Sequence, residues 1–157
     1  MKGQIRAIEP SDIKGLKKVL DSIELFPSEY LEEMMSDYLT NPESHDSWFT
    51  CIYENEPLAI AYCVPEKFTE GTYNLLAIGV AQEAQRKGIA SEMMQYIEQQ
   101  LIHKEARILL VETSNAAAQA GARNLYKRLR YKQEAIIRDF WKEGEDKLVF
   151  WKKLTGM

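Results

Sequence analysis

The stretch Gln85-Arg86-Lys87-Gly88-Ile89-Ala90 decides the fold of this 157-residue chain. The run that precedes it, Leu75-Leu76-Ala77-Ile78-Gly79-Val80, is short and continuously apolar, which predicts a strand covered on both faces. After it, apolar residues recur at every fourth position and predict an amphipathic helix that begins at about Gly88; they are Ile89, Met93, Ile97 and Leu101. The stretch therefore connects a buried strand to the N-terminus of a helix.

A helix N-terminus at this place predicts a binding site for anionic oxygens. The first turn of a helix has backbone N–H groups without an intrahelical partner and carries about half a positive charge. Arg86 and Lys87 add their own positive charges beside it. Gly88 allows the backbone to approach a phosphate, and the small Ala90 keeps the first turn open. We therefore interpret the stretch as a pyrophosphate-binding loop.

The remaining pattern predicts a single mixed α/β (α+β) domain over residues 1–157. Ser11 is expected to cap a first helix that ends near residue 23, and a second helix is expected to start at Pro27-Ser28 and stop at Asn41-Pro42. A further helix is expected between the last strands. The expected strands are residues 4–8, 48–53, 58–64, 72–80, 107–112, 131–140 and 148–154. This order implies a mixed sheet with helices on its faces.

Composition and charge favour a globular protein. Apolar residues make up 45% and charged residues 28% of the chain, and the net charge is −4. A nucleic-acid binder or an anionic-membrane binder is usually basic, so neither nucleic acid nor a membrane is an expected partner. The chain opens on charged sequence, and no apolar run has the length of a signal peptide or a membrane span, so we expect a cytoplasmic protein.

The cysteines and histidines do not form a metal or nucleophile pattern. Cys51 and Cys63 lie in apolar, strand-like runs, where a free cysteine packs as a small hydrophobic residue. His45 lies in a loop-like stretch and His103 at a helix end, and their spacing is not that of zinc ligands. We therefore expect no metal site and no cysteine nucleophile.

Three motifs in order resemble the GNAT N-acetyltransferase superfamily. The Q-x-x-G-x-A pattern of residues 85–90 is similar to its acetyl-CoA signature. Val111-Glu112-Thr113-Ser114 follows a second apolar strand, and residues 122–131 (ARNLYKRLRY) resemble the A-x-x-L-Y-x-x-x-G-[FY] helix of the superfamily. The tail from Ile137 to Trp151 resembles the closing strand pair of one bacterial branch. The resemblance covers nearly the whole chain.

The resemblance implies a GNAT-like fold, with a central mixed, mostly antiparallel sheet of about seven strands and about four flanking helices. It also implies acetyl-CoA as the donor and CoA as a product. The backbone of the last strand residues would hold the pantetheine arm, and the loop with the first helical turn would hold the diphosphate. The implied cofactor-binding residues are Ile78, Gly79, Val80, Gln85, Arg86, Lys87, Gly88, Ile89, Ala90 and Ser91.

The resemblance implies two catalytic residues. Tyr126 occupies the position of a tyrosine that commonly protonates the leaving thiolate, which a phenol with an ordinary pKa near 10 can do. The alternative is that Tyr126 packs beside Leu125 and Leu129. Glu112 ends the preceding strand and is expected to act as the base for the acceptor, unless it is simply an exposed carboxylate. Asp139 and Glu70 are further candidates.

Two positions depart from the superfamily pattern. Arg130 replaces a glycine at the end of the tyrosine helix, where we expect a left-handed backbone conformation. Gln119 stands where many relatives have asparagine, and Asn115 is expected to supply the missing cofactor contact. The first departure predicts strain at a helix end, and the second predicts an altered contact to acetyl-CoA.

The resemblance favours transfer of an acetyl group from acetyl-CoA to a primary amine by direct attack in a ternary complex. The alternative is a non-catalytic CoA-binding sensor or scaffold on the same fold. A P-loop phosphotransferase is excluded, since the sequence has no G-x-x-x-x-G-K-[ST]. The partner is expected to be a small-molecule or peptide amine, which Phe26, Pro27 and Tyr30 would contact. Assembly as a homodimer is left open.

Overall fold

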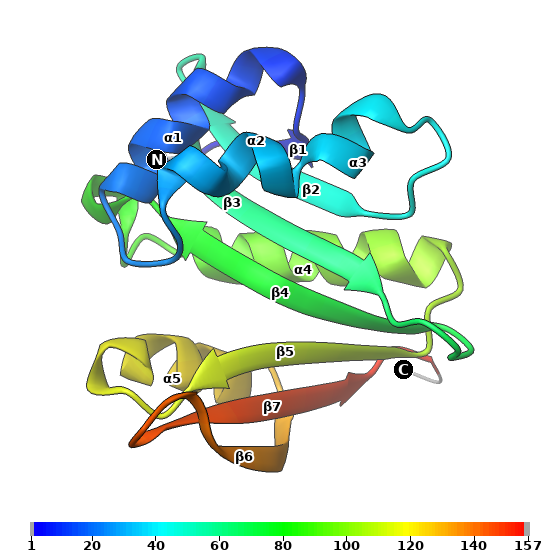
Figure 1. Cartoon of the computed structure of the whole chain (residues 1–157). Helices are drawn as coiled ribbons and strands as arrows, with labels where there is room; N and C mark the ends of the chain where they lie inside the picture. The colour runs from blue at the N-terminus through cyan, green and yellow to red at the C-terminus, as the bar shows by residue number, and fades with distance from the viewer. Residues whose placement is uncertain (1, 156–157) are drawn as a thin grey trace. The chain divides into compact units, whose positions relative to one another are not determined.

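The structure is a computed structural model that describes residues 2–155, and it confirms the mixed α/β class (Figure 1). The strands are β1 (Gln4–Ala7), β2 (Ser47–Tyr53), β3 (Glu56–Pro65), β4 (Thr72–Val80), β5 (Ile108–Ser114), β6 (Lys132–Lys142) and β7 (Glu145–Lys153). The α-helices are α1 (Ile13–Asp21), α2 (Leu31–Met34), α3 (Ser36–Thr40), α4 (Ile89–His103) and α5 (Ala120–Arg128). Hydrogen bonds order the strands β1-β2-β3-β4-β5-β7-β6 in a seven-stranded sheet.

The chain divides into two compact units, each of which is described by itself. Within the described part, the first unit contains residues 2–64 and 76–99, and the second contains residues 65–75 and 100–155. Strand β4 and helix α4 each continue from one unit into the other. No helix within residues 2–155 combines the length and apolar character needed to cross a membrane.

The first unit packs helices on both faces of an antiparallel β1–β2–β3 arrangement. One face carries the core cluster formed by α1, α2 and the strands, whose buried residues are Ile8, Leu16, Leu20, Leu31, Met35, Trp48 and Ile60. On the other face, the ring of Phe49 meets that of Tyr96 on α4, with 5.4 Å between their centres. Cys51 and Cys63 are fully buried, as expected, and form no disulfide within residues 2–155. Burial raises the pKa of the Cys51 thiol.

An ion pair, and not Ser11, organises the start of the first helix. Asp12 accepts two hydrogen bonds from the Arg6 guanidinium, at 2.7 and 3.0 Å, and one from the backbone N–H of Glu9 at 2.8 Å. Glu9 is the N-cap of a short 3-10 helix over Pro10–Asp12 that leads into α1. The expectation that Ser11 caps the helix is therefore wrong, because Ser11 lies inside the 3-10 helix and the two N-cap positions are Glu9 and Asp12.

The expected second helix is broken. It begins as a 3-10 turn over Ser28–Tyr30, continues as α2, and restarts as α3 after Met35. Met35 is fully buried in the core cluster, and its backbone (φ −87°, ψ −1°) departs from α-helical geometry. The helix stops at Asn41, as predicted, and the break raises the number of α-helices in the described residues from the expected four or so to five.

The second unit is built on mixed strand pairing. Strand β5 pairs in parallel with the first part of β4, over Thr72–Leu75, and antiparallel with β7. One face of these strands is buried under α5, where the Tyr126 ring lies 5.5 Å from that of Phe150 on β7. The other face carries Glu112 on β5 and Lys147 on β7. The second unit therefore has one apolar face and one face that carries charge.

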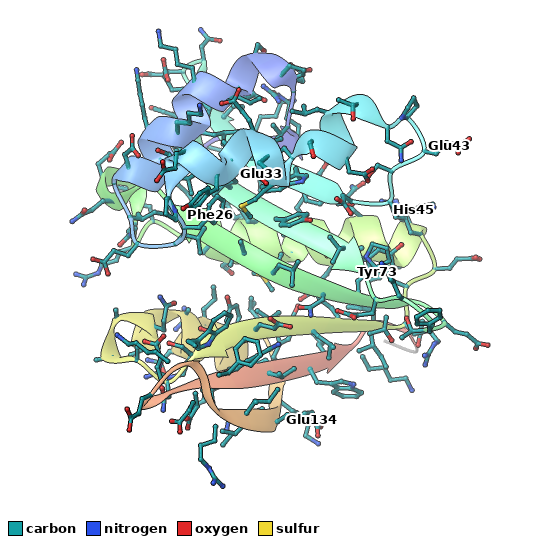
Figure 2. The ribbon with its side chains drawn as sticks, in the orientation of Figure 1. Phe26, Glu33, Glu43, His45, Tyr73 and Glu134 are labelled. Carbon is teal, nitrogen blue, oxygen red and sulfur yellow. The ribbon has the colours of Figure 1, made fainter. Side chains whose placement is uncertain are left out.

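Strand β6 is exposed along its whole length. Its ladder with β7 shifts between Gln133 and Ala135 and again between Ile137 and Lys142, and Asp139 within the second shift has a positive φ of 55°. Bulges of this kind bend a strand and interrupt its row of hydrogen bonds. The side chain of Glu134, at the first shift, extends away from the ribbon (Figure 2).

The strand and helix around the quoted stretch have the predicted order, with one correction. Strand β4 spans Thr72–Val80 and α4 begins at Ile89, and the four residues of its apolar stripe are buried. The strand is not covered on both faces as expected, because Leu76 is 40% exposed. An apolar run predicts burial only where other elements actually cover both faces of the strand.

The end of α5 confirms the left-handed conformation expected at Arg130, whose φ is 71°. The backbone N–H of Arg130 bonds to the carbonyl of Lys127 at 3.1 Å, and that of Tyr131 bonds to the carbonyl of Tyr126 at 2.9 Å. These are the two hydrogen bonds of a Schellman motif, and the rings of Tyr126 and Tyr131, 6.0 Å apart, add its apolar contact. The motif requires a positive φ at Arg130, a conformation that glycine adopts without strain.

We expect Arg130→Gly to stabilise the protein by about 1 kcal/mol, because glycine removes the penalty that a Cβ incurs at positive φ. For a chain of this size the melting temperature should rise by about 2–4 °C. Arg128→Gly is the matched control, since it removes the same charge from the helical end of α5 and should lower the melting temperature. A fall for Arg130→Gly would show that its side chain makes a stabilising contact.

Candidate functional site

The loop before α4 exposes backbone at the start of a long helix. Arg86 and Gly88 have positive φ values of 63° and 84°, and the side chains of Gln85, Arg86 and Lys87 are exposed. Apart from its chain neighbours, no heavy atom of residues 2–155 lies within 4 Å of the position that a Cβ would take at Gly88. The loop thus leaves open space in front of the α4 N-terminus, which fits an anionic group.

The predicted strand residues lie just before this loop, in the first unit. The side chain of Gln85 donates a hydrogen bond to the Val80 carbonyl at 3.1 Å, so Gln85 ties the loop to the end of β4. A Cβ at Gly79 would come within 2.5 Å of Ile23 Cδ1 and 3.1 Å of Leu25 Cδ2. The absence of a side chain at Gly79 therefore lets the backbone of β4 lie close to Ile23 and Leu25, in the segment after α1.

Strand β4 extends beyond its pairing with β5. The parallel ladder in the described residues joins Thr72–Leu75 to Ile108–Val111, and β4 continues for five more residues to Val80. Backbone groups of Ile78 to Val80 on that edge are not used in this ladder. Strand backbone of this kind can pair with an extended ligand.

The second unit contains a buried polar cluster around Asn74. The Asn74 Nδ2 group donates to Glu112 Oε2 at 2.7 Å and to Glu66 Oε1 at 3.0 Å. Lys147 Nζ lies 2.9 Å from the same Glu112 oxygen, and the Lys147 and Glu112 side chains are only 14% and 15% exposed. Asn74 is itself buried, and no donor among the described residues reaches its Oδ1. We call these four residues the Asn74 cluster.

The Asn74 cluster holds the carboxylate of Glu112 in one orientation. One carboxylate oxygen, Oε2, is held by an amide and an ammonium, so the orientation of the carboxylate is fixed. A carboxylate that is both oriented and partly shielded from water can accept a proton from a cation beside it.

Tyr126 is buried on the opposite face of the sheet of the second unit. It is 2% exposed, and its ring packs against Tyr131 and Phe150. Burial raises the pKa of the Tyr126 phenol above its ordinary value, so the group remains protonated at neutral pH. The packing role that the sequence left open is therefore present, and a role as a proton donor stays a prediction.

The other predicted residues of the second unit have structural contacts. Asn115 Oδ1 accepts a hydrogen bond from the backbone N–H of Asp146 at 3.0 Å, and so braces the β6–β7 hairpin. Asp139 Oδ1 accepts one from the backbone N–H of Gly144 at 2.9 Å, so Asp139, within β6, contacts the turn of the same hairpin. Glu70 is exposed beside a surface pocket of about 400 Å³.

The residues expected to contact an acceptor lie after α1 in the first unit. Phe26, labelled in Figure 2, packs against the core cluster, and with Pro27 it lines a shallow pocket of about 390 Å³. Tyr30 is half exposed. That Phe26, Pro27 and Tyr30 contact an acceptor stays a prediction.

Sequence reasoning missed Glu66 and Lys147. Glu66 lies in the loop after β3, and Lys147 reaches Glu112 because residue 147 of β7 is paired with Ser114, next to Glu112 on the same face. The register of β5 and β7 brings Lys147 to Glu112, and the loop after β3 brings Glu66 to Asn74. The alternation of apolar and polar residues along β7 could have predicted the face on which Lys147 lies. It could not have predicted that Lys147 contacts Glu112.

Comparison with known proteins places this geometry among acetyltransferases. The family model described as "Acetyltransferase (GNAT) family" matches residues 17–131. Among solved structures, a GNAT-family protein from Desulfovibrio desulfuricans is 23% identical, with a TM-score of 0.90 over 98% of this chain and 99% of that one. The ribosomal-protein-S18-alanine N-acetyltransferase of Escherichia coli is 18% identical, with a TM-score of 0.80 over 99% and 96%. An aminoglycoside 6′-N-acetyltransferase complexed with coenzyme A is 13% identical, with a TM-score of 0.78 over 98% of both chains. No curated protein matches the sequence.

We expect Asn74→Leu to destabilise the protein by about 1–3 kcal/mol, because two partly buried carboxylates lose their shared donor. Urea unfolding measures this loss. A double-mutant cycle with Glu112→Gln should give a coupling energy well above the error of the measurement. Asn124→Leu, an exposed amide on α5, is the control and should change stability by less than about 0.5 kcal/mol. Equal effects at both asparagines would mean that the Asn74 cluster contributes nothing to folding.

Proposed function

Because the chain belongs to the acetyltransferase (GNAT) family, we propose that it moves an acetyl group from acetyl-CoA to a primary amine by direct attack in a ternary complex. The observation that carries the proposal is the exposed loop before α4, with Arg86 and Gly88 at positive φ and open space at Gly88. Such a loop suits a diphosphate, which is the most strongly anionic part of CoA.

The residues of the first unit would hold the donor. The backbone N–H groups of Gly88 to Ser91 and the side chains of Arg86 and Lys87 would bind the diphosphate, and the free edge of β4 at Ile78 to Val80 would bind the pantetheine arm. When bound, acetyl-CoA would supply a thioester whose carbon–sulfur bond would break as the amine nitrogen bonds to the acetyl carbon. The ammonium nitrogen would lose two protons in all, one to Glu112 before the attack and one to water as the amide forms, and the sulfur would leave as a thiolate.

Glu112 would take the proton of the acceptor. A primary amine is an ammonium ion at neutral pH and must lose a proton before its nitrogen can attack. The Oε2 atom of Glu112 is held by Asn74 and Lys147, which leaves the other carboxylate oxygen to accept that proton directly or through one water. Asn74 is then a positioning residue, because it orients the carboxylate.

Tyr126 would give a proton to the departing thiolate. The raised pKa of the buried phenol keeps its proton in place until a strong acceptor develops beside it. The same burial makes the phenol a weaker acid than free tyrosine. We therefore expect its contribution to lie at the low end of the range for general acids.

The acceptor is a small-molecule or peptide amine. The named acceptors of the structural neighbours differ, since one is a ribosomal-protein alanine and another an aminoglycoside, and so they do not select one for this chain. We place the protein in the cytoplasm, a reducing compartment, which fits two cysteines that form no disulfide within the described residues.

The alternative is a CoA-binding sensor or scaffold without turnover. An assay of thiol release from acetyl-CoA with a panel of primary amines discriminates the two. Turnover with any amine supports the transferase. Binding of acetyl-CoA without thiol release from the whole panel would favour the sensor.

Gly88→Glu should abolish acetyl-CoA binding, because it places a bulky anion in the open space at the α4 N-terminus. Titration calorimetry measures the affinity. Gly144→Glu is a close control, because Gly144 also has a positive φ (83°) and, within the described residues, open space where its Cβ would be. Both variants should lose about 1 kcal/mol of stability, and only Gly88→Glu should lose binding. Equal affinity in the two variants would rule out a diphosphate site in this loop.

Tyr126→Phe should lower kcat about 10²-fold while acetyl-CoA affinity changes little, because the ring remains and only the proton donor is lost. Thiol release measures kcat. Tyr131→Phe, in the same aromatic group, should leave kcat within a few-fold of the original. Full turnover in Tyr126→Phe would leave Tyr126 as a packing residue.

A further inference from the structure

An exposed apolar surface begins beside the Asn74 cluster. It consists of three β6 residues, Ile137, Phe140 and Trp141, which are 45%, 48% and 46% exposed. Ile137 pairs directly with Lys147, the residue that contacts Glu112. We call these three residues the β6 platform. A ligand that covers apolar side chains of this size removes them from water, which makes the free energy of binding more favourable.

Two contacts fix the rings of the platform. Lys147 Nζ lies 4.3 Å from the centre of the Phe140 ring and 2.9 Å from Glu112 Oε2, so the ring centre is at most 7.2 Å from that carboxylate oxygen. Trp141 Nε1 donates a hydrogen bond to the Thr113 carbonyl at 3.2 Å. The two rings meet edge to face, with 4.8 Å between their centres. The platform is therefore ordered before any ligand binds, which lowers the entropic cost of binding.

The charge beside the platform suits a single ammonium group. Glu66 and Glu112 contribute two negative charges to the Asn74 cluster and Lys147 contributes one positive charge, which leaves a net charge of −1. Asn74 Oδ1 is a buried acceptor that no described residue satisfies, and it belongs to the amide that contacts Glu112. Both features favour a cation with N–H donors.

We propose that the acceptor is a primary amine whose carbon skeleton carries an aromatic or similarly large apolar group. Its nitrogen lies at Glu112 and its apolar group covers Phe140 and Trp141. The proposal rests on the proposed function and specifies the substrate class of that site. A small hydrophilic amine would satisfy the carboxylate but leave the platform exposed to water.

Acetylation of 2-phenylethylamine and ethylamine tests the proposal, because these amines differ only by the phenyl ring. We expect kcat/KM from thiol release to be at least about 10-fold higher for 2-phenylethylamine. Calorimetric titration of 2-phenylethylamine into protein without acetyl-CoA gives an independent readout. It should show binding that ethylamine does not show at the same concentration.

Three variants separate the platform from general effects. Trp141→Ala should reduce the ratio of the two kcat/KM values to near one, and Trp141→Phe, which keeps an aromatic face, should retain most of it. Ile136→Ala is the control: Ile136 is also exposed on β6 but pairs with Leu148, on the opposite face, so the ratio should not change.

The outcomes distinguish this proposal from the proposed function. Equal kcat/KM values for the two amines, with no effect of Trp141→Ala on the ratio, overturn the substrate class and leave the transferase intact. Binding of 2-phenylethylamine that depends on Trp141, without thiol release, supports the platform and contradicts turnover. A doubled mass by light scattering that Trp141→Ala halves would assign the platform to a second copy of the chain and overturn the proposal.

Discussion

The parallel pairing of β4 with β5 is the constraint on which the candidate site depends. Parallel neighbours cannot be joined by a tight turn, so the chain must leave the end of β4, cross over and return to the start of β5. Helix α4 makes this crossover, and its N-terminus therefore follows the carboxyl end of β4 after a short loop. Ligand sites of open α/β sheets form at such strand ends. This connection is what places the loop from Gln85 to Gly88, the diphosphate site that we propose, at the start of α4.

Much of the fold could be predicted because its signals are local. The apolar period of α4 and the glycine and proline turns depend on residues a few positions apart, and the left-handed turn at Arg130 followed from the resemblance of its helix end to a known motif. The failures occurred where distant residues decide the local structure. Met35 breaks a helix because its side chain is held in a core built from four other elements. Asp12 replaces Ser11 in organising a helix start because Arg6, on β1, binds it.

The residues of the candidate site also fall into two groups, those that local sequence motifs predicted and those that only the folded structure shows. The loop, Tyr126 and Glu112 belong to contiguous motifs, so the sequence alone could single them out as candidates, and their roles stay predictions. Glu66 and Lys147 are separated from Glu112 by 46 and 35 residues. The loop after β3 brings Glu66 to Asn74, and the register of β5 and β7 brings Lys147 to Glu112. The amide of Asn74 does no acid–base work itself, yet its two N–H donors orient the carboxylates of Glu66 and Glu112. A sequence can indicate which single residues are candidates for catalysis or binding. It does not indicate which hydrogen bonds distant residues share.

The irregularity of β6 has a consequence for the behaviour of the protein in concentrated solution. An exposed edge strand that carries isoleucine, phenylalanine and tryptophan is a ready template for strand addition by another chain. In β6 the shift at Glu134 and the left-handed Asp139 interrupt the row of backbone donors and acceptors, and charged residues flank the apolar ones. A strand from another chain could not form a continuous row of hydrogen bonds along β6. The exposed apolar side chains of β6 therefore do not make the strand a template for aggregation by strand addition.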